Sequence, residues 1–135
     1  MCIRTKRSHL TLLGVYAPKE GKQELNCVFY ETLQKAVQRA RAGPLEDLII
    51  VGDLLNAQVG AEKINKCVGS FGAGPVNTNG KQLIDFCALH KLRILHTFFC
   101  HKMSHKYTWS SRGSSSMIDF VIAREETVRR CTDTR

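Results

Sequence analysis

Two aspartates stand at positions where a carboxylate could carry chemistry. Asp53 directly follows the apolar run Leu-Ile-Ile-Val at 48–51 and Gly52, and Asp119 lies inside the apolar run at 117–122. Ligands of α/β sheets bind beyond the carboxyl ends of strands, and a buried carboxylate must be paired, hydrogen-bonded or bound to a metal. Structural interpretations stay open as well: Asp53 could form an Asx turn, and Asp119 a salt bridge or a tether to the backbone.

A third polar residue, Asn56, follows Asp53 closely. Two carboxylates and an amide near strand ends suit a hard cation such as Mg²⁺, which prefers oxygen ligands and usually keeps several waters. Such an ion stabilises the charge that builds on a phosphodiester oxygen in the transition state. Gly52 would let the backbone turn closely at this point. The pattern therefore favours a site for a phosphate substrate.

Other candidate metal ligands are Cys100, His101 and His105. They could hold a metal if their segment were helical, but no fourth ligand is evident, and the sequence favours a solvated basic loop. The chain has six cysteines and no Cys-x-x-Cys pair. We interpret them as reduced thiols, with Cys27 and Cys87 as small buried residues of helices.

The composition points to a soluble globular domain with a basic surface. The 135 residues include 20 Lys and Arg against 12 Asp and Glu, a formal net charge of +8. This charge indicates a polyanionic partner, or simply a protein kept soluble by its charge. A hydrophobic content of 43% excludes a disordered tail, a collagen-like repeat and a small disulfide scaffold. Since no apolar run has membrane-spanning length and the amino terminus lacks a secretory core, we expect a nuclear or cytoplasmic protein with no membrane contact.

The elements that must position these residues alternate between strand and helix. A strand is predicted at 9–16, ended by Pro18, and an apolar stripe at three- and four-residue steps predicts a helix at 25–40. The continuous apolar run at 48–51 predicts a short strand buried on both faces. Strand, helix and buried strand in this order form an α/β pattern.

The second half of the chain is predicted with less regular elements. Residues 56–80 are expected to form a long loop, and Gly80 to open a helix that runs to about His90 with Leu83, Ile84, Cys87 and Leu89 facing inward. Strands follow at 92–99, 107–110 and 117–123, with a turn at 111–116 and a helical or frayed tail at 124–135. Alternation places Asp119 on one face of its strand with Met117 and Val121.

Five short motifs resemble the endonuclease/exonuclease/phosphatase superfamily, the fold of abasic-site endonucleases and DNase I. They occur in the order and near the spacing of that family, and they are most similar to the endonuclease domain of LINE-type retrotransposons and to the craniofacial development protein 2-like sequences derived from it. The first motif is Val-Tyr-Ala-Pro at 15–18, and the second is the segment 49–53 together with Asn56 and Ala57. The third consists of Asn-Gly at 79–80, Leu83 and Asp-Phe-Cys at 85–87. The last two are Tyr-Thr-Trp at 107–109 and Ile-Asp-Phe at 118–120.

The resemblance implies a fold and a role for each matching residue. The fold would be an α+β, DNase I-like four-layer sandwich of mixed and antiparallel sheets flanked by helices. Tyr16 would contact the scissile phosphate or help to orient the nucleophile. Asp53 would be the general base that activates water, with Asn56 as its partner near the phosphate. Asp119 would orient the catalytic histidine of the family. Asn79, Thr108 and Trp109 would lie on the DNA-binding surface, although the segment at 77–80 also reads as a plain turn.

The departures from the family predict a partial domain. The family motif is Gly-Asp-x-Asn, whereas here both Leu54 and Leu55 separate Asp53 from Asn56, and residues three apart in an extended segment face opposite ways. We expect a basic tail at 1–8, a partial domain at 9–123, and a tail at 124–135. The amino-terminal half and the carboxyl-terminal histidine motif of the family have no counterpart here. Partly uncovered strands at 48–51 and 117–123 should leave an exposed apolar patch.

Three functions are compatible with these patterns. The first is a Mg²⁺-dependent phosphodiesterase or endonuclease of retrotransposon origin acting on DNA, weak or inactive because it is incomplete. Mg²⁺ is the cofactor that the family implies, but no metal ligand is assigned, because the family's metal-binding glutamate has no counterpart before His9. The second is a non-catalytic remnant that binds nucleic acid or a protein. The third is a translated retrotransposon fragment with no settled role.

Overall fold

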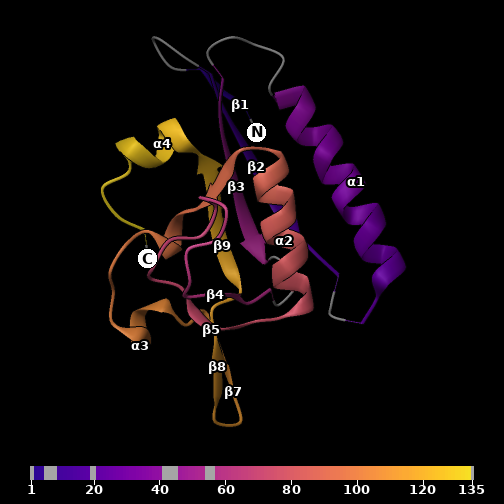
Figure 1. Cartoon of the computed structure of the whole chain (residues 1–135). Coiled ribbons are helices and arrows are strands. Elements are labelled where there is room, and N and C mark those ends of the chain that lie inside the picture. Colours follow the sequence, from indigo (N-terminus) through magenta and orange to yellow (C-terminus); the bar gives the residue numbers. More distant parts are fainter. Residues whose placement is uncertain (1, 5–8, 19–20, 41–45, 54–56, 135) are drawn as a thin grey trace.

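The computed structural model describes residues 2–4, 9–18, 21–40, 46–53 and 57–134 (Figure 1). A five-stranded mixed sheet is its main feature. In the order in which they lie side by side, its strands are β1 (Cys2–Arg4), β2 (His9–Tyr16), β3 (Glu46–Asp53), β9 (Asp119–Arg124) and β6 (Leu92–Ile94). β2 and β3 pair in parallel, and the other neighbours pair antiparallel.

The parallel pair follows from the long helix α1 (Gln23–Ala40), which carries the chain from the end of β2 back toward the start of β3. Parallel strands need such a crossover, because the chain must return to the same end of the sheet. The strand at 9–16 and the helix at 25–40 are thereby confirmed. Cys2–Arg4, within the segment taken as a tail, forms the edge strand β1.

Helices α1 and α2 (Thr78–Leu89) lie together over one face of the sheet (Figure 1). Their contact includes the rings of Tyr30 and Phe86, whose centroids are 5.4 Å apart. The core between these helices and the sheet is made of fully buried apolar side chains. They include Val37, Leu48, Ile50, Leu83, Cys87, Phe120 and Ile122.

The opposite face of the sheet is covered only in part. The 3₁₀ turn η1 (Leu95–Thr97) and helix α4 (Glu125–Arg130) form a smaller cluster there with Ala123. Val51 stays 39% exposed, and Tyr16 is 74% exposed. The prediction that 48–51 is buried on both faces is therefore wrong for one face, whereas the expected uncovered strand surface is present at Val51. The expectation of a partly uncovered strand at 117–123 is wrong, because these residues are largely buried.

Helix α1 corrects the expected apolar stripe. Leu25 and Val28 are 51% and 60% exposed, and Cys27 is exposed as well. The buried face instead begins at Asn26 and continues through Leu33. Counting apolar residues misplaced the start of the stripe, because the first turns of α1 present their polar Asn26 to the neighbouring helix α2.

Helix α2 confirms the inward positions Leu83, Ile84 and Cys87, but Leu89 is 71% exposed. The strand predicted at 92–99 ends at Ile94, since the chain then turns into η1.

The predicted loop at 56–80 contains the short pair β4 (Val59–Gly60) and β5 (Ala73–Val76). Helix α3 (Met103–Lys106) precedes a hairpin of β7 (Trp109–Ser111) and β8 (Ser114–Ser116), which replaces the predicted turn and extends from the body of the molecule (Figure 1).

These elements confirm the α+β class. The described part of the chain consists of a mixed sheet, the helices α1 and α2 on one face, η1 and α4 on the other, and short antiparallel pairs around it. In that part, no helix combines the length and the apolar character needed to cross a membrane.

Candidate functional site

Three of the residues singled out in the sequence form one row across the sheet. Tyr16 of β2 is the register partner of Asp53 of β3, and Asp53 is in turn the partner of Asp119 of β9. Side chains of directly paired residues lie on the same face, with Cβ atoms roughly 4.5–5.5 Å apart in an antiparallel pair. The row therefore brings together one phenol and two carboxylates from segments far apart in the sequence.

The row lies on the face of the sheet that the helices α1 and α2 do not cover. Val15 and Phe120, the neighbours of Tyr16 and Asp119, pack into the helix-covered core, so Tyr16 and Asp119 point the other way. Tyr16 is strongly exposed, and Asp53 and Asp119 are partly exposed. A ligand from solvent can therefore reach all three side chains.

Gly52 shapes the end of β3 at this row. A Cβ atom built on Gly52 would lie 1.8 Å from the carbonyl oxygen of Val15, far inside any real contact, and the φ angle of Gly52 is +157°. Only glycine tolerates such an approach. The sequence predicts a close turn at Gly52, whereas the residue lies inside β3 and instead allows β2 and β3 to approach closely.

Thr108 fixes the start of β9. Its hydroxyl oxygen accepts hydrogen bonds from the backbone N–H groups of Ile118 and Asp119, both at 3.1 Å. Its own N–H donates to the carbonyl of Ser116. The side chain assigned to the DNA-binding surface by resemblance thus has a structural task, which is to hold Asp119 at its place in the row.

The buried His96 of η1 supports the same strand and was not singled out in the sequence. Its Nδ1 accepts a hydrogen bond of 3.3 Å from the N–H of Val121, and its ring packs edge-on to Phe120. A single histidine in an apolar run carries no pattern that predicts this contact. The residue could be found only once β6 and β9 were known to be neighbours.

Trp109 lies in β7 and is 45% exposed. Across the hairpin, the hydroxyl of Ser115 donates to that of Ser110. The tip consists of Arg112 and Gly113, both with positive φ, as expected for a tight two-residue hairpin turn. The hairpin thus presents an aromatic ring and a cation to solvent, and a contact of Trp109 with DNA stays a prediction.

Asn79 is placed differently from the expectation. It is 2% exposed in the first turn of α2, and its side-chain oxygen accepts a hydrogen bond of 3.4 Å from Asn26 of α1. Its neighbour Asn77 is the N-cap of α2 and accepts from the N–H groups of Gly80 and Gln58. Because so buried a side chain does not reach the surface, Asn79 belongs to the contact between two helices rather than to a substrate-binding surface.

Asn56 lies outside the described residues, so its place beside Asp53 stays a prediction.

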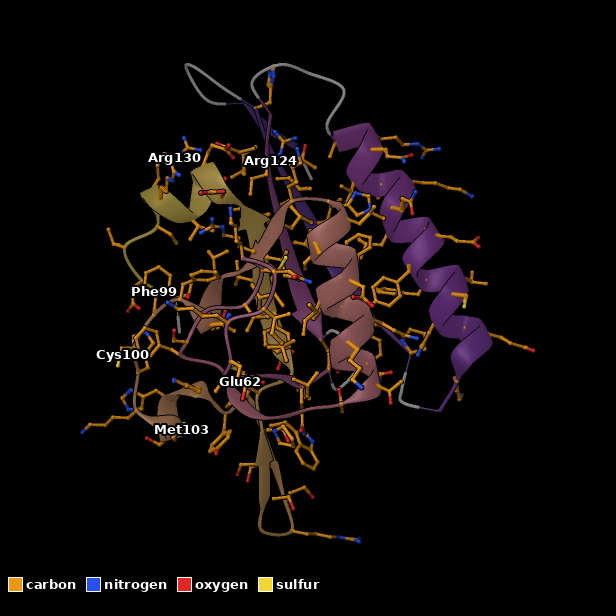
Figure 2. The ribbon with its side chains drawn as sticks, in the orientation of Figure 1. Glu62, Phe99, Cys100, Met103, Arg124 and Arg130 are labelled. Atoms are coloured by element: carbon orange, nitrogen blue, oxygen red, sulfur yellow. The ribbon has the colours of Figure 1, made fainter. Side chains whose placement is uncertain are left out.

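His101 pairs with Asp133 at 2.6 Å, and Cys100 and His105 are exposed. Within the described residues, no group of three or more His, Cys, Asp or Glu side chains is arranged to hold a metal ion. Figure 2 shows Phe99 and Cys100 at one edge of the molecule, between α3 and α4.

The fold and the row together define an α+β protein with a pair of carboxylates on the open face of a mixed sheet.

Two curated proteins are similar to this chain: craniofacial development protein 2 of Tragulus javanicus and of Bos taurus. Each is 36% identical over 123 residues, which is 89% of this chain but 21% and 20%, respectively, of those proteins. The chain thus spans about a fifth of the length of these relatives. No family model matches it.

Proposed function

We propose that this chain is a phosphodiesterase-type domain of retrotransposon origin, of the endonuclease/exonuclease/phosphatase superfamily, that acts on DNA with weak turnover. The observation that carries the proposal is the row of Tyr16, Asp53 and Asp119 across three adjacent strands. The five motifs and the similarity to craniofacial development protein 2 support it.

The row contains groups that can take part in the hydrolysis of a phosphodiester. A carboxylate such as Asp53 can accept the proton of an attacking water molecule, and a phenol such as Tyr16 can donate a hydrogen bond to a phosphate oxygen. Asp119 is held in line by the hydroxyl of Thr108. The open face leaves room for a long substrate to pass over these side chains.

The donor set fits Mg²⁺. Like charges on directly opposite residues destabilise a sheet, and a divalent cation held by Asp53 and Asp119 would offset this repulsion. Mg²⁺ is commonly held by one or two carboxylates, with water and substrate phosphates completing its shell. When bound, the ion would supply stabilisation of the charge that develops on the phosphate. Because both Leu54 and Leu55 separate Asp53 from Asn56, we expect turnover to be weak.

Nicking of a supercoiled plasmid tests this proposal. We expect slow nicking by the wild-type chain that requires Mg²⁺ and is lost in Asp53→Ala. Asp85→Ala is the matched control, because Asp85 is exposed on α2 and lies on the other side of the sheet. Deleting Leu55, which restores the Gly-Asp-x-Asn spacing, should increase the rate. Nicking that persists in EDTA, or that Asp53→Ala retains in full, would contradict the proposal.

A non-catalytic nucleic-acid-binding domain is the second candidate. The net charge of +8 and the exposed β7–β8 hairpin with Trp109 and Arg112 favour it. Trp109 is the single tryptophan of the chain, so its fluorescence reports directly on contacts at the hairpin. Salt-sensitive quenching by DNA without any Mg²⁺-dependent nicking would select this function over the first.

A further inference from the structure

A second candidate site lies beside β6, the edge strand that pairs with β9, at a distance from the carboxylate row along the strands. A groove of about 540 Å³ runs between the segment at 63–71, Arg93 of β6 and Phe98. This volume is typical of small-ligand sites. We propose that the groove, called here the β6 groove, binds one nucleotide unit, its phosphate held by cations and its base by phenylalanine rings.

Cations gather in the β6 groove. Lys63, Lys66 and Arg93 line it, and a smaller adjoining pocket shares Lys66 and Arg93 and adds Lys91. In the described part of the chain, the three lysines form no ion pair. A surface with several unpaired cations in one concavity attracts a phosphate group.

The acidic residues nearby leave this charge largely uncompensated. Glu125 accepts ion pairs of 2.8 Å from both Arg93 and Arg129. The Arg129 hydrogen bond, together with the charges of both arginines, lowers the pKa of Glu125 despite partial desolvation, so it stays a carboxylate at neutral pH. Glu62 precedes Lys63, and Figure 2 labels it on the same segment, but it does not line the groove. One carboxylate therefore faces four cations.

Two aromatic rings provide a surface for a base. Phe71 is 38% exposed, and Phe98 is half-buried with the Arg93 guanidinium 5.4 Å from its ring centroid. Phenylalanine rings and guanidinium planes are the groups on which unpaired bases stack. The Arg93 guanidinium over the ring of Phe98 and the partly exposed ring of Phe71 therefore favour a nucleotide over an isolated phosphate.

The backbone of the loop holds the lysines at the groove. Asn65 and Lys66 are consecutive non-glycine residues with φ of +47° and +60°, a conformation that L-residues rarely adopt. The loop is closed by the bridge between Ile64 and Val68, and the N–H of Ile94 in β6 donates to the carbonyl of Cys67. These contacts fix the turn against the sheet, so the position of Lys66 is set by the fold.

The β6 groove is distinct from the carboxylate row. Arg93 is the register partner of Ala123, four residues along β9 from Asp119. At about 3.3 Å per residue, this separation is roughly 13 Å along the strand. The groove is therefore a site of its own, and it does not depend on the nuclease proposal.

Calorimetric titration of the full chain with 2′-deoxyadenosine 5′-monophosphate tests the site. We expect saturable binding that weakens at least tenfold in the double variant Lys63→Gln/Lys66→Gln. The control Lys22→Gln/Lys35→Gln removes the same charge from two exposed lysines near and on α1 and should change affinity less than twofold. Phe71→Leu should weaken binding of the nucleotide but not of inorganic phosphate. Asp53→Ala should leave nucleotide binding unchanged even if it abolishes nicking.

Titration with a single-stranded oligodeoxynucleotide distinguishes two possible ligands of the groove, an unpaired nucleotide within a strand and a free nucleotide. Binding of the strand at least tenfold tighter than the mononucleotide assigns the groove to an unpaired nucleotide of a strand, and equal affinity assigns it to free nucleotides. No binding of the mononucleotide or the strand, equal losses in both double variants, or equal binding of an acidic peptide would overturn the proposal.

Discussion

Asp53 of β3 and Asp119 of β9 are direct partners in the antiparallel pairing of their strands. In the sequence these two carboxylates are far apart and each is unusual by itself, whereas in the structure they lie opposite each other on neighbouring strands. Tyr16 extends the same row on β2. We propose that the two carboxylates share a cation that is bound together with a phosphate.

Thr108 should control the position of Asp119. Thr108→Val keeps the shape of the side chain but removes the acceptor for the N–H groups of Ile118 and Asp119. We expect a loss of about 0.5–1.5 kcal/mol in the free energy of unfolding, together with faster hydrogen exchange at those two amides. Thr32→Val on the exposed surface of α1 is the control and should cost less than about 0.5 kcal/mol. Unchanged exchange at Asp119 in Thr108→Val would show that the hydroxyl does not hold the strand.

Gly52 should not tolerate a side chain. In Gly52→Ala the new Cβ would meet the backbone carbonyl of Val15, so β2 and β3 must separate, and we expect a loss of about 3 kcal/mol in chemical denaturation. Gly14→Ala is the matched control on the adjacent strand, because no atom lies within 4 Å of its Cβ position. It should stay within about 0.5 kcal/mol of the wild type. Equal stability of the two variants would refute the close approach.

Tyr30 carries a buried hydroxyl with no hydrogen-bond partner among the described residues. Burial, with a smaller contribution from Cys87, raises the pKa of this phenol. Tyr30→Phe keeps the ring contacts with Phe29 and Phe86 and removes the unsatisfied group. We therefore expect unfolding to require about 1 kcal/mol more than in the wild type. A destabilised Tyr30→Phe would mean that the hydroxyl has a partner in solution.

The thiols should differ strongly in reactivity. Burial raises the pKa of Cys87 well above its ordinary value and also raises that of Cys67, which lowers their thiolate fractions at any given pH. Cys27 and Cys100 are exposed. At pH 8, alkylation followed by mass spectrometry should therefore modify Cys27 and Cys100 at least about a hundredfold faster than Cys87. Comparable rates at Cys27 and Cys87 would contradict the packing of α2 against the sheet.

Local patterns in the sequence were sufficient to predict the main elements. The predictions of the strand at 9–16 and of the helix at 25–40 rest on periodicity and on the proline that follows the strand, which act within a few residues. The motif residues Asp53 and Asp119 were also found, because a carboxylate next to an apolar run is unusual. Their direct pairing could not be predicted, since it depends on which strands become neighbours.

The errors have a shared physical cause, which is tertiary context. Leu25 and Val28 have the right residue type for a core, but α1 turns Asn26 toward α2 instead. Asn79 matches a motif associated with DNA, yet the packing of the two helices buries it. Thr108 is exposed, so its place on a DNA-binding surface stays a prediction, whereas its hydrogen bonds to β9 appear only when the hairpin is in place.

The most direct test of the central claim is the Mg²⁺ affinity of the carboxylate row, measured by isothermal titration calorimetry. We predict one Mg²⁺ site in the wild-type chain, weakened at least about tenfold in both Asp53→Asn and Asp119→Asn and unchanged in Asp85→Asn. Equal Mg²⁺ affinity in all four proteins, or no binding by the wild type, would contradict the claim that Asp53 and Asp119 form one site.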